Sequence, residues 1–263
     1  MSADRATASA VPPPSVDVLG IPLALTDYGR TLDWMDATIV SGGAGYVCVA
    51  ATHTVMACQE DPELRAAVLS SDLTVPDGQP LVWALSALGH KLTSRVYGPE
   101  LMARSFERSA LSGTRMFLYG GRNEGALVQL TLNLRRRYPG VQVVGGFAPP
   151  YRALSEAERE ALVVEINGSG ADVVWVGIGV PKQEKWMAAM RPRLTAPVLI
   201  GVGAAFDFHA GLVPQAPSWM QSAGMEWVYR LAREPRRLWK RYLRYNPRFV
   251  TGFARQWLRQ ALR

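Results

Sequence analysis

Two glycine-containing segments place backbone and side-chain groups where they could bind an anion. The segments are Val176–Met187 and Ile200–Gly211, and each is an apolar run that ends in a glycine turn. In the first segment, Gly177 and Gly179 are followed by the polar side chains of Lys182, Gln183 and Glu184. Backbone N–H groups at a strand-to-helix turn bind anions, and polar side chains beside them can recognise a ligand's hydrogen-bonding edge. This pattern indicates a site for a phosphorylated small molecule.

Other residues with chemical potential lie near the ends of further apolar runs. Asp77 comes directly before Gly78, where it can act as a base or simply stabilise a turn. Gly120 and Gly121 end another apolar run in the same way. Arg95 is available either to bind phosphate or to form a surface salt bridge.

The spacing of these residues excludes several familiar cofactor motifs. A dinucleotide fingerprint would need a third glycine where the chain has Lys182 in one turn and Phe206 in the other. The sequence contains no Walker lysine and no Asp-x-Asp pair, and Asp207 with His209 alone do not make a metal site. We therefore expect neither a nicotinamide cofactor nor a metal ion.

Apolar runs and helical patterns alternate along most of the chain. Strands are predicted at Tyr46–Ala50, Leu73–Val75, Arg115–Tyr119, Val141–Gly145, Asp172–Gly177 and Val198–Val202. Helices are predicted at Thr54–Ser70, Pro80–Leu88, Glu100–Ser109, Asn123–Tyr138 and Ser155–Asn167. The alternation predicts an α/β fold, with a mostly parallel, Rossmann-like sheet flanked by helices. Ligands of such sheets bind at the carboxyl ends of the strands, where the turns at 76–78, 120–121, 177–184 and 201–207 would meet.

Charge is distributed very unevenly along the chain. The net charge is +7, but residues 230–263 hold eleven Lys or Arg and one acid, Glu234, so this segment alone carries +10. Helical patterns over 225–233 and from Pro235 onward, with a break expected at Pro247, make it an amphipathic appendage rich in aromatic residues. Such an appendage can lie on anionic lipid, bind nucleic acid, or form a solvated helical pair; the aromatic and arginine faces favour lipid.

The composition sets the remaining boundaries. Residues 1–15, with three prolines, are expected to be a disordered lead-in, residues 16–213 the α/β core and residues 214–263 the appendage. The two cysteines form no disulfide framework, which favours a reducing compartment. The sequence predicts neither a transmembrane segment nor a secretory signal.

Several of these segments, in this order, resemble the WecG/TagA/CpsF glycosyltransferases, also called glycosyltransferase family 26. The matching segments are DPELRAAVLSSDLTVPDGQPLVWA (61–84), RVYGPELM (95–102), FLYGG (117–121), FAPPYRALSEAE (147–158), VGIGVPKQEKWM (176–187), GVGAAFDFHAG (201–211) and APSWMQSAGMEWVYRLAREPRRLWKRYLRYNPRF (216–249). They cover nearly everything from about residue 46 to 250. The segments PLVWALSALGH and RVYGPEL are most similar to the exopolysaccharide members, which add glucose to a lipid-linked unit.

The resemblance implies an inverting, metal-independent transferase that moves a sugar from a UDP-sugar to an undecaprenyl-diphosphate saccharide. It implies a peripheral location on the cytoplasmic face of the inner membrane, with the appendage on the anionic surface. Asp77 is the implied catalytic base. The implied donor-binding residues are Gly78, Arg95, Gly120, Gly121, Gly177, Gly179, Pro181, Lys182, Gln183 and Glu184. Contacts from the appendage are implied for Arg230, Arg233, Arg236 and Arg237.

The chain departs from the family pattern at one place. Many members carry Thr-x-Asn before the first helix of the matched region, and those positions are Val49 and Ala51 here. Neighbouring Thr52 and His53 are the candidate replacements, so the sugar, glucose or N-acetylmannosamine in type, stays open, as does a homo-oligomeric state. The alternative class is a non-catalytic nucleotide- or nucleic-acid-binding protein with a basic arm, although no other feature resembles a nucleic-acid module.

Overall fold

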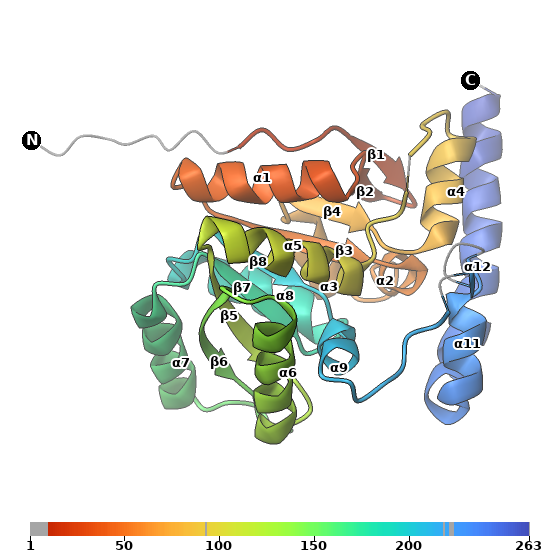
Figure 1. Ribbon diagram of the computed structural model, residues 1–263. Helices are drawn as coiled ribbons and strands as arrows, with labels where there is room; N and C mark the ends of the chain where they lie inside the picture. Colours follow the sequence, from red (N-terminus) through yellow and green to blue (C-terminus); the bar gives the residue numbers. More distant parts are fainter. Residues whose placement is uncertain (1–9, 93, 218, 221–223, 263) are drawn as a thin grey trace, which may run out of the picture.

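A parallel β-sheet of six strands forms the centre of the fold (Figure 1). The computed structural model describes residues 10–92, 94–217, 219–220 and 224–262, without the side chain of Arg237. In spatial order the strands are β4 (Leu73–Pro76), β3 (Gly45–Ala50), β8 (Val198–Gly201), β7 (Val173–Gly177), β5 (Arg115–Gly120) and β6 (Gln142–Phe147). All of their pairings are parallel, which confirms the predicted α/β class.

Helices cover both faces of this sheet, because the central strands are apolar on both sides. Successive residues of β3 enter opposite core clusters, Val47 and Val49 on one face and Tyr46 and Cys48 on the other. The first face packs against α1 (Tyr28–Val40), α5 (Gly98–Ser112), α6 (Glu124–Arg137) and α9 (Ala205–His209). The second packs against α2 (Thr52–Ala57), α3 (Pro62–Leu69), α4 (Gln79–Ala87), α7 (Glu156–Ser169) and α8 (Lys182–Met190). A 3₁₀ turn, η1 (Arg191–Arg193), follows α8.

Most predicted elements are confirmed, but the helix expected over Thr54–Ser70 is wrong. The segment forms two helices, α2 and α3, because Asp61 adopts an extended backbone and its side chain accepts a hydrogen bond from Leu64 N. Pro62 at the first position of α3 reinforces this helix start. The capping box of Ser155 and Glu158 is present at the start of α7.

The region before β3 contains elements that the sequence patterns did not indicate. An antiparallel hairpin pairs β1 (Ser15–Val18) with β2 (Ile21–Ala24), and α1 follows it with Asp27 as its N-cap. The strands are too short for a clear alternation of apolar and polar residues. Residues 1–9, most of the segment expected to be disordered, lie outside the described residues, whereas Ser15 already belongs to β1.

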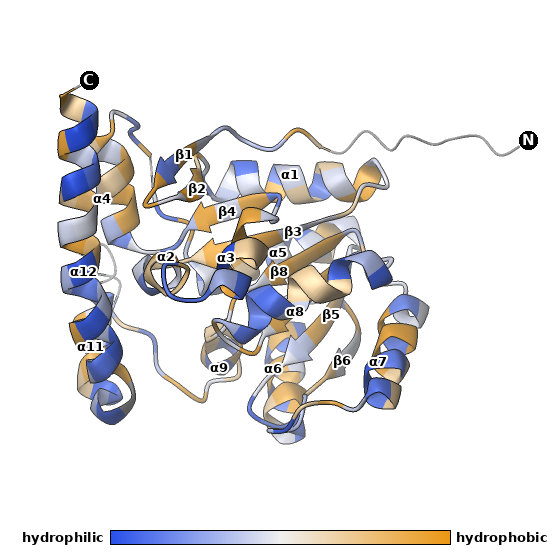
Figure 2. Cartoon of the chain, turned by 180° about the vertical axis from the view of Figure 1, so that it is seen from behind, coloured by the Kyte–Doolittle hydropathy of each residue, from blue (hydrophilic) through white to orange (hydrophobic). Residues whose placement is uncertain are grey.

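The appendage consists of α11 (Glu226–Arg233) and α12 (Pro235–Ala261), and α12 lies beside α4 in Figure 1. The expected break at Pro247 is wrong, because α12 continues through this residue as one helix. A proline inside a helix removes one backbone donor. Packing compensates for that loss, since Leu238 and Phe249 on either side of Pro247 are buried. By residue hydropathy, most of α12 is hydrophilic (Figure 2).

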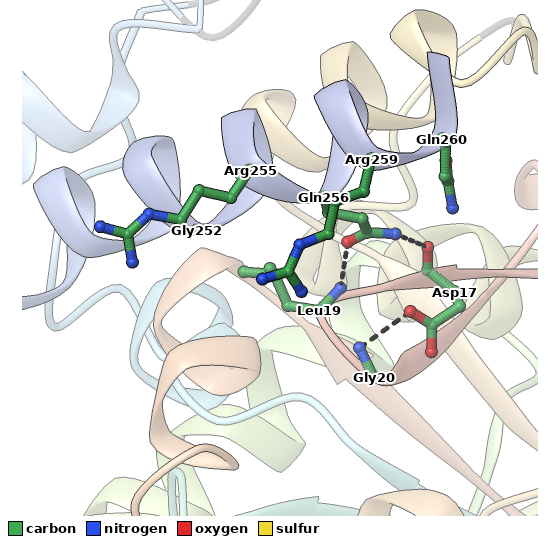
Figure 3. A pocket seen from close by; sticks show the side chains of 8 residues that line it. All are labelled: Asp17, Leu19, Gly20, Gly252, Arg255, Gln256, Arg259 and Gln260. Atoms are coloured by element: carbon green, nitrogen blue, oxygen red, sulfur yellow. Dashed lines mark hydrogen bonds between the residues drawn. The ribbon is translucent and has the colours of Figure 1, made fainter. Parts of the chain in front are cut away.

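Polar contacts dock α12 on the body at three places. The carboxylate of Glu60 accepts hydrogen bonds from Arg244, Tyr245 and Arg248. Figure 3 shows the second place, a groove where Gln256 bonds to the backbone of Leu19 and Asp17 in the β1–β2 turn. At the third place, Trp257 Nε1 donates to Ala87 O at the end of α4. Among the described residues, no helix is both long and apolar enough to span a bilayer.

Candidate active site

A cavity of about 1160 Å³ opens at the carboxyl ends of β5, β7 and β8. Because all strands of the sheet are parallel, the turns that follow them meet at this one edge. The turns supply Gly121, Gly177, Gly179 and Gly203 to the wall, and α8 supplies Lys182 and Trp186. The loop after β6 and the end of α11 complete it with Tyr151, Arg152, Arg233 and Glu234. This volume suits a ligand the size of a nucleotide sugar.

Glycine is required at the floor of this cavity because two backbone turns touch there. A Cβ on Gly120, whose φ is +139°, would lie 2.7 Å from the backbone of Gly177. The turns after β7 and β8 also touch, since a Cβ on Gly203 would lie 3.8 Å from Gly179 Cα. The close approach leaves bare backbone facing the cavity, as a phosphate site requires.

Gln183 and Glu184 contact these turns from the protein interior and do not line the cavity. Gln183 is 2% exposed, accepts a hydrogen bond from Gly179 N at 3.2 Å and donates one to Glu184 Oε1 at 2.9 Å. Glu184 is fully buried and its Oε2 has no hydrogen-bond partner, so burial raises its pKa to about 7. Pro181 is exposed ahead of α8 and does not line the cavity either. Among the four residues 181–184, Lys182 alone contributes to the described cavity wall.

An aromatic stack forms another part of the cavity wall. Tyr119, at the end of β5, stacks on Trp186 of α8 with ring centroids 4.1 Å apart and planes 15° apart. Phe147 stacks on Tyr119 at 6.2 Å. Since Tyr119 and Trp186 both line the cavity, they offer apolar ring surface of the kind that holds a nucleobase.

Cationic side chains surround the rest of the cavity. Arg122 binds the carboxylate of Asp207 through two hydrogen bonds of 3.0 and 3.1 Å, and Arg152, Arg159, Lys182 and Arg233 also line the wall. No ion pair is formed by Lys182 or Arg233 with any residue that the structure describes. An anion with several charges would therefore find unneutralised cations here.

Asp77 lies at the same edge of the sheet, at the carboxyl end of β4. Its backbone N donates to Ala50 O, and its Oδ1 is buried without a hydrogen-bond partner. The pKa of Asp77 is raised to about 7, mainly by burial; Glu226 adds to the rise, whereas Arg95, Arg230 and a backbone hydrogen bond from Gly98 oppose it. The carboxylate is consequently a much stronger base than an ordinary aspartate.

Arg95 reaches toward Asp77 and is held by the appendage. Its Nη2 donates to Glu226 Oε2 at 2.7 Å, and both side chains are nearly buried, with 14% and 9% exposed. The guanidinium also lies over the ring of Tyr97, 4.4 Å from the centroid. Neighbouring carboxylates raise the pKa of Arg95, although burial alone would lower it.

One stripe of α11 connects the Asp77 region with the cavity. Glu226, Arg230 and Arg233 follow one another at helical spacing on the same face. Glu226 pairs with Arg95 near Asp77, Arg230 lies over the ring of Phe208 in α9, and Arg233 lines the cavity. At 1.5 Å per residue, the stripe spans roughly 10 Å. Asp77 itself does not line the cavity.

The loop at the end of β8 lies between Asp77 and the cavity. The backbone N–H of Gly98 bonds to Asp77, and a Cβ on Gly98 would lie 3.5 Å from Val202 O. Gly203 follows Val202 and lines the cavity. The predicted base is therefore connected to the glycine turns through Gly98 and Val202.

The positions that replace Thr-x-Asn lie beside the same acid. Val49 is buried, and its Cγ1 would lie 3.5 Å from a Cβ on Gly98, while Ala51 N bonds to Thr54 Oγ1. Thr52 Oγ1 would lie 3.7 Å from a Cβ on Gly78. Burial, with Arg241 and Arg230 nearby, lowers the pKa of His53 to about 3, so its ring is neutral. Thr52 and His53 thus remain candidates for sugar contacts.

Two of the predicted appendage arginines, Arg236 and Arg237, are not part of the described cavity wall. Arg236 is exposed in the first turn of α12 and does not line the cavity. The side chain of Arg237 lies outside the described residues. Asp207 and His209 are held by Arg122 and by Pro99 O, respectively, and the residues that the structure describes contain no group of His, Cys, Asp and Glu suited to a metal ion.

Sequence reasoning missed Glu226, Tyr119, Trp186 and Arg122 as parts of the site. Glu226 lies 131 residues from its partner Arg95, so no local pattern could pair the two. The aromatic pair had a weak signal, because Tyr119 directly precedes Gly120 and Trp186 lies on the outer side of the first turns of α8.

The geometry combines a cavity lined by glycine turns and cationic side chains with a buried carboxylate at the same edge of the sheet. A family model described as "Glycosyl transferase WecG/TagA/CpsF family" matches residues 16–263. The chain belongs to this family of glycosyltransferases, which act on lipid-linked sugars in cell-wall and polysaccharide synthesis. The family implies a nucleotide-sugar donor and a lipid-linked acceptor, and its members act at the membrane.

Proposed function

We propose that this protein is an inverting glycosyltransferase that moves a sugar, glucose or N-acetylmannosamine in type, from a UDP-sugar to an undecaprenyl-diphosphate saccharide. Its place is the cytoplasmic face of the inner membrane, in surface or exopolysaccharide synthesis. The observation that carries the proposal is the α11 stripe, which joins the cationic cavity to the Asp77 carboxylate over roughly 10 Å. A diphosphate with its attached sugar has this length.

In this arrangement the uracil ring lies against Trp186 and Tyr119, and the diphosphate lies on the glycine turns. Lys182, Arg230 and Arg233 neutralise the charge that develops on the leaving UDP. These cations supply the stabilisation that a divalent metal gives in other transferases, so we propose that none is needed.

The sugar then lies near Asp77, with Thr52 and His53 beside it. Asp77 accepts the proton of the acceptor hydroxyl as that oxygen attacks the anomeric carbon and UDP departs from the opposite face. Because its pKa is about 7, the carboxylate is a competent base near neutral pH. Direct attack by the acceptor inverts the anomeric configuration.

The test is UDP release from a panel of UDP-sugars, with and without an undecaprenyl-diphosphate saccharide in detergent micelles. We expect release that requires both the correct sugar and the acceptor, and a product whose anomeric configuration is inverted by NMR. Saturable binding of RNA or DNA without any sugar transfer would instead favour the nucleic-acid-binding alternative.

A further inference from the structure

The appendage contributes an acid to the site as well as arginines. Glu226, in the first turn of α11, is buried, with 7% of the residue exposed. Burial of a carboxylate is unfavourable unless a cation compensates it, and Arg95 does so at 2.7 Å. Val96 N donates to Pro76 O at 2.8 Å, which brings Arg95 and Asp77, the neighbours of these two residues, together. The guanidinium thus lies between two carboxylates, one from the α/β core and one from the appendage.

We propose, on the basis of the function proposed above, that Glu226 is a positioning residue: its ion pair holds Arg95 and prevents that cation from fully neutralising Asp77. Arg95 would otherwise be free to form a close pair with Asp77, and a carboxylate paired with arginine is a weak base. Asp77 Oδ1 instead has no hydrogen-bond partner and stays available for the proton of an acceptor.

The other charged groups around Asp77 do not remove this effect. Arg230, from the same helix, lowers the pKa of Asp77, and Glu226 opposes it. Tyr28 of α1 and Tyr97 before α5 also face the acid, but burial raises the pKa of both phenols, so they are neutral near pH 7. Glu226 is therefore the acid of the appendage that raises the pKa of Asp77 most.

The variant Glu226→Gln removes the charge and keeps an oxygen that can accept from Arg95. The titration of Asp77 is followed by carboxyl ¹³C NMR in the ligand-free, full-length protein, and Asp77→Asn assigns its signal. We expect the Asp77 midpoint to fall by about one pH unit in Glu226→Gln, since loss of a nearby like charge favours the ionised form. Glu226→Asp should restore most of the shift.

Glu60→Gln is the matched control, because it removes the carboxylate that anchors Arg244 and Arg248 of α12 away from the site. It should leave the Asp77 midpoint unchanged. Trypsin digestion checks that the appendage of Glu226→Gln stays docked, as protected as in the wild type. An unchanged midpoint in Glu226→Gln, an equal shift in Glu60→Gln, or a shift that accompanies release of the appendage each overturns the proposal.

The reaction provides a second measurement. The acidic limb of the kcat/KM profile should move to lower pH in Glu226→Gln by the same amount as the NMR midpoint. If the wild type transfers no sugar, the proposed function fails, whereas the NMR titration still decides the role of Glu226.

Discussion

Replacement of Asp77 by asparagine should make the protein more stable and almost inactive. Folding buries this carboxyl and raises its pKa from 3.8 to about 7. In the folded protein the acid thus keeps its proton up to a higher pH than in the unfolded chain. The free energy of unfolding that this group contributes is fully present below about pH 4, and it is lost as the pH rises through 7. A shift of about 3 units corresponds to about 4 kcal/mol.

The gain in Asp77→Asn will be smaller than that limit, because the buried amide has no ready partner and Arg95 loses one of its two carboxylates. We expect about half, or about 2 kcal/mol above pH 7, which raises Tm by roughly 4–8 °C for a chain of this size. Near pH 4, where the wild-type acid is protonated, the cost of the buried amide remains without the gain, so the variant should have the lower Tm, by a similar amount. Removal of a general base should lower turnover by roughly 10²–10⁴-fold.

Thermal unfolding of both proteins at constant ionic strength, at several values between pH 4 and 8.5, measures the difference. Asp33→Asn serves as the control, because it makes the same chemical change on a side chain that is 68% exposed, and its Tm difference should not grow with pH. A Tm difference for Asp77→Asn that stays constant or decreases as the pH rises would show that Asp77 is well solvated, and the reasoning about its basicity would be wrong.

Two further predictions concern the ligands. Arg233→Ala should weaken UDP binding by roughly 10–100-fold, because one charge-assisted hydrogen bond is lost. Arg136→Ala on α6 makes the same change of charge and should leave UDP binding unchanged. Calorimetric titration with UDP measures both affinities, and equal effects would remove Arg233 from the diphosphate site. The protein should sediment with anionic vesicles and not with neutral ones, because each basic residue of α12 near the lipid contributes about 1 kcal/mol. Since salt screens these charges, about 0.5 M salt should release the protein. Equal binding to neutral vesicles would contradict the membrane role of α12.

The position of Asp77 could be predicted from sequence, whereas the direction of Gln183 and Glu184 could not. A strand that ends in Pro76-Asp77-Gly78 places its aspartate at the carboxyl edge in any parallel sheet. In α8, by contrast, only packing decides which side of the first turn faces the cavity. The contacts of Gln183 with Gly179 and Glu184 turn both side chains inward and leave Lys182 outside.

Long-range contacts also explain the error at Pro247. Local rules end a helix near proline, since one hydrogen bond is lost. Burial of Leu238 and Phe249, together with the hydrogen bonds that Glu60 accepts, stabilises the whole length of α12 and outweighs that local loss. Glu60, the partner on the body, is far from Pro247 in sequence, so the local pattern underestimated the continuity of the appendage.

The basicity of Asp77 and the docking of the appendage depend on the same contacts. Burial is the main cause of the raised Asp77 pKa, and α11 adds Glu226, which raises it, and Arg230, which lowers it. If α11 leaves, Asp77 becomes solvated and its pKa returns toward that of an ordinary aspartate, so the base weakens as Arg233 leaves the cavity. A single helix thereby sets the strength of the base at one end of the donor and supplies charge to the diphosphate at the other.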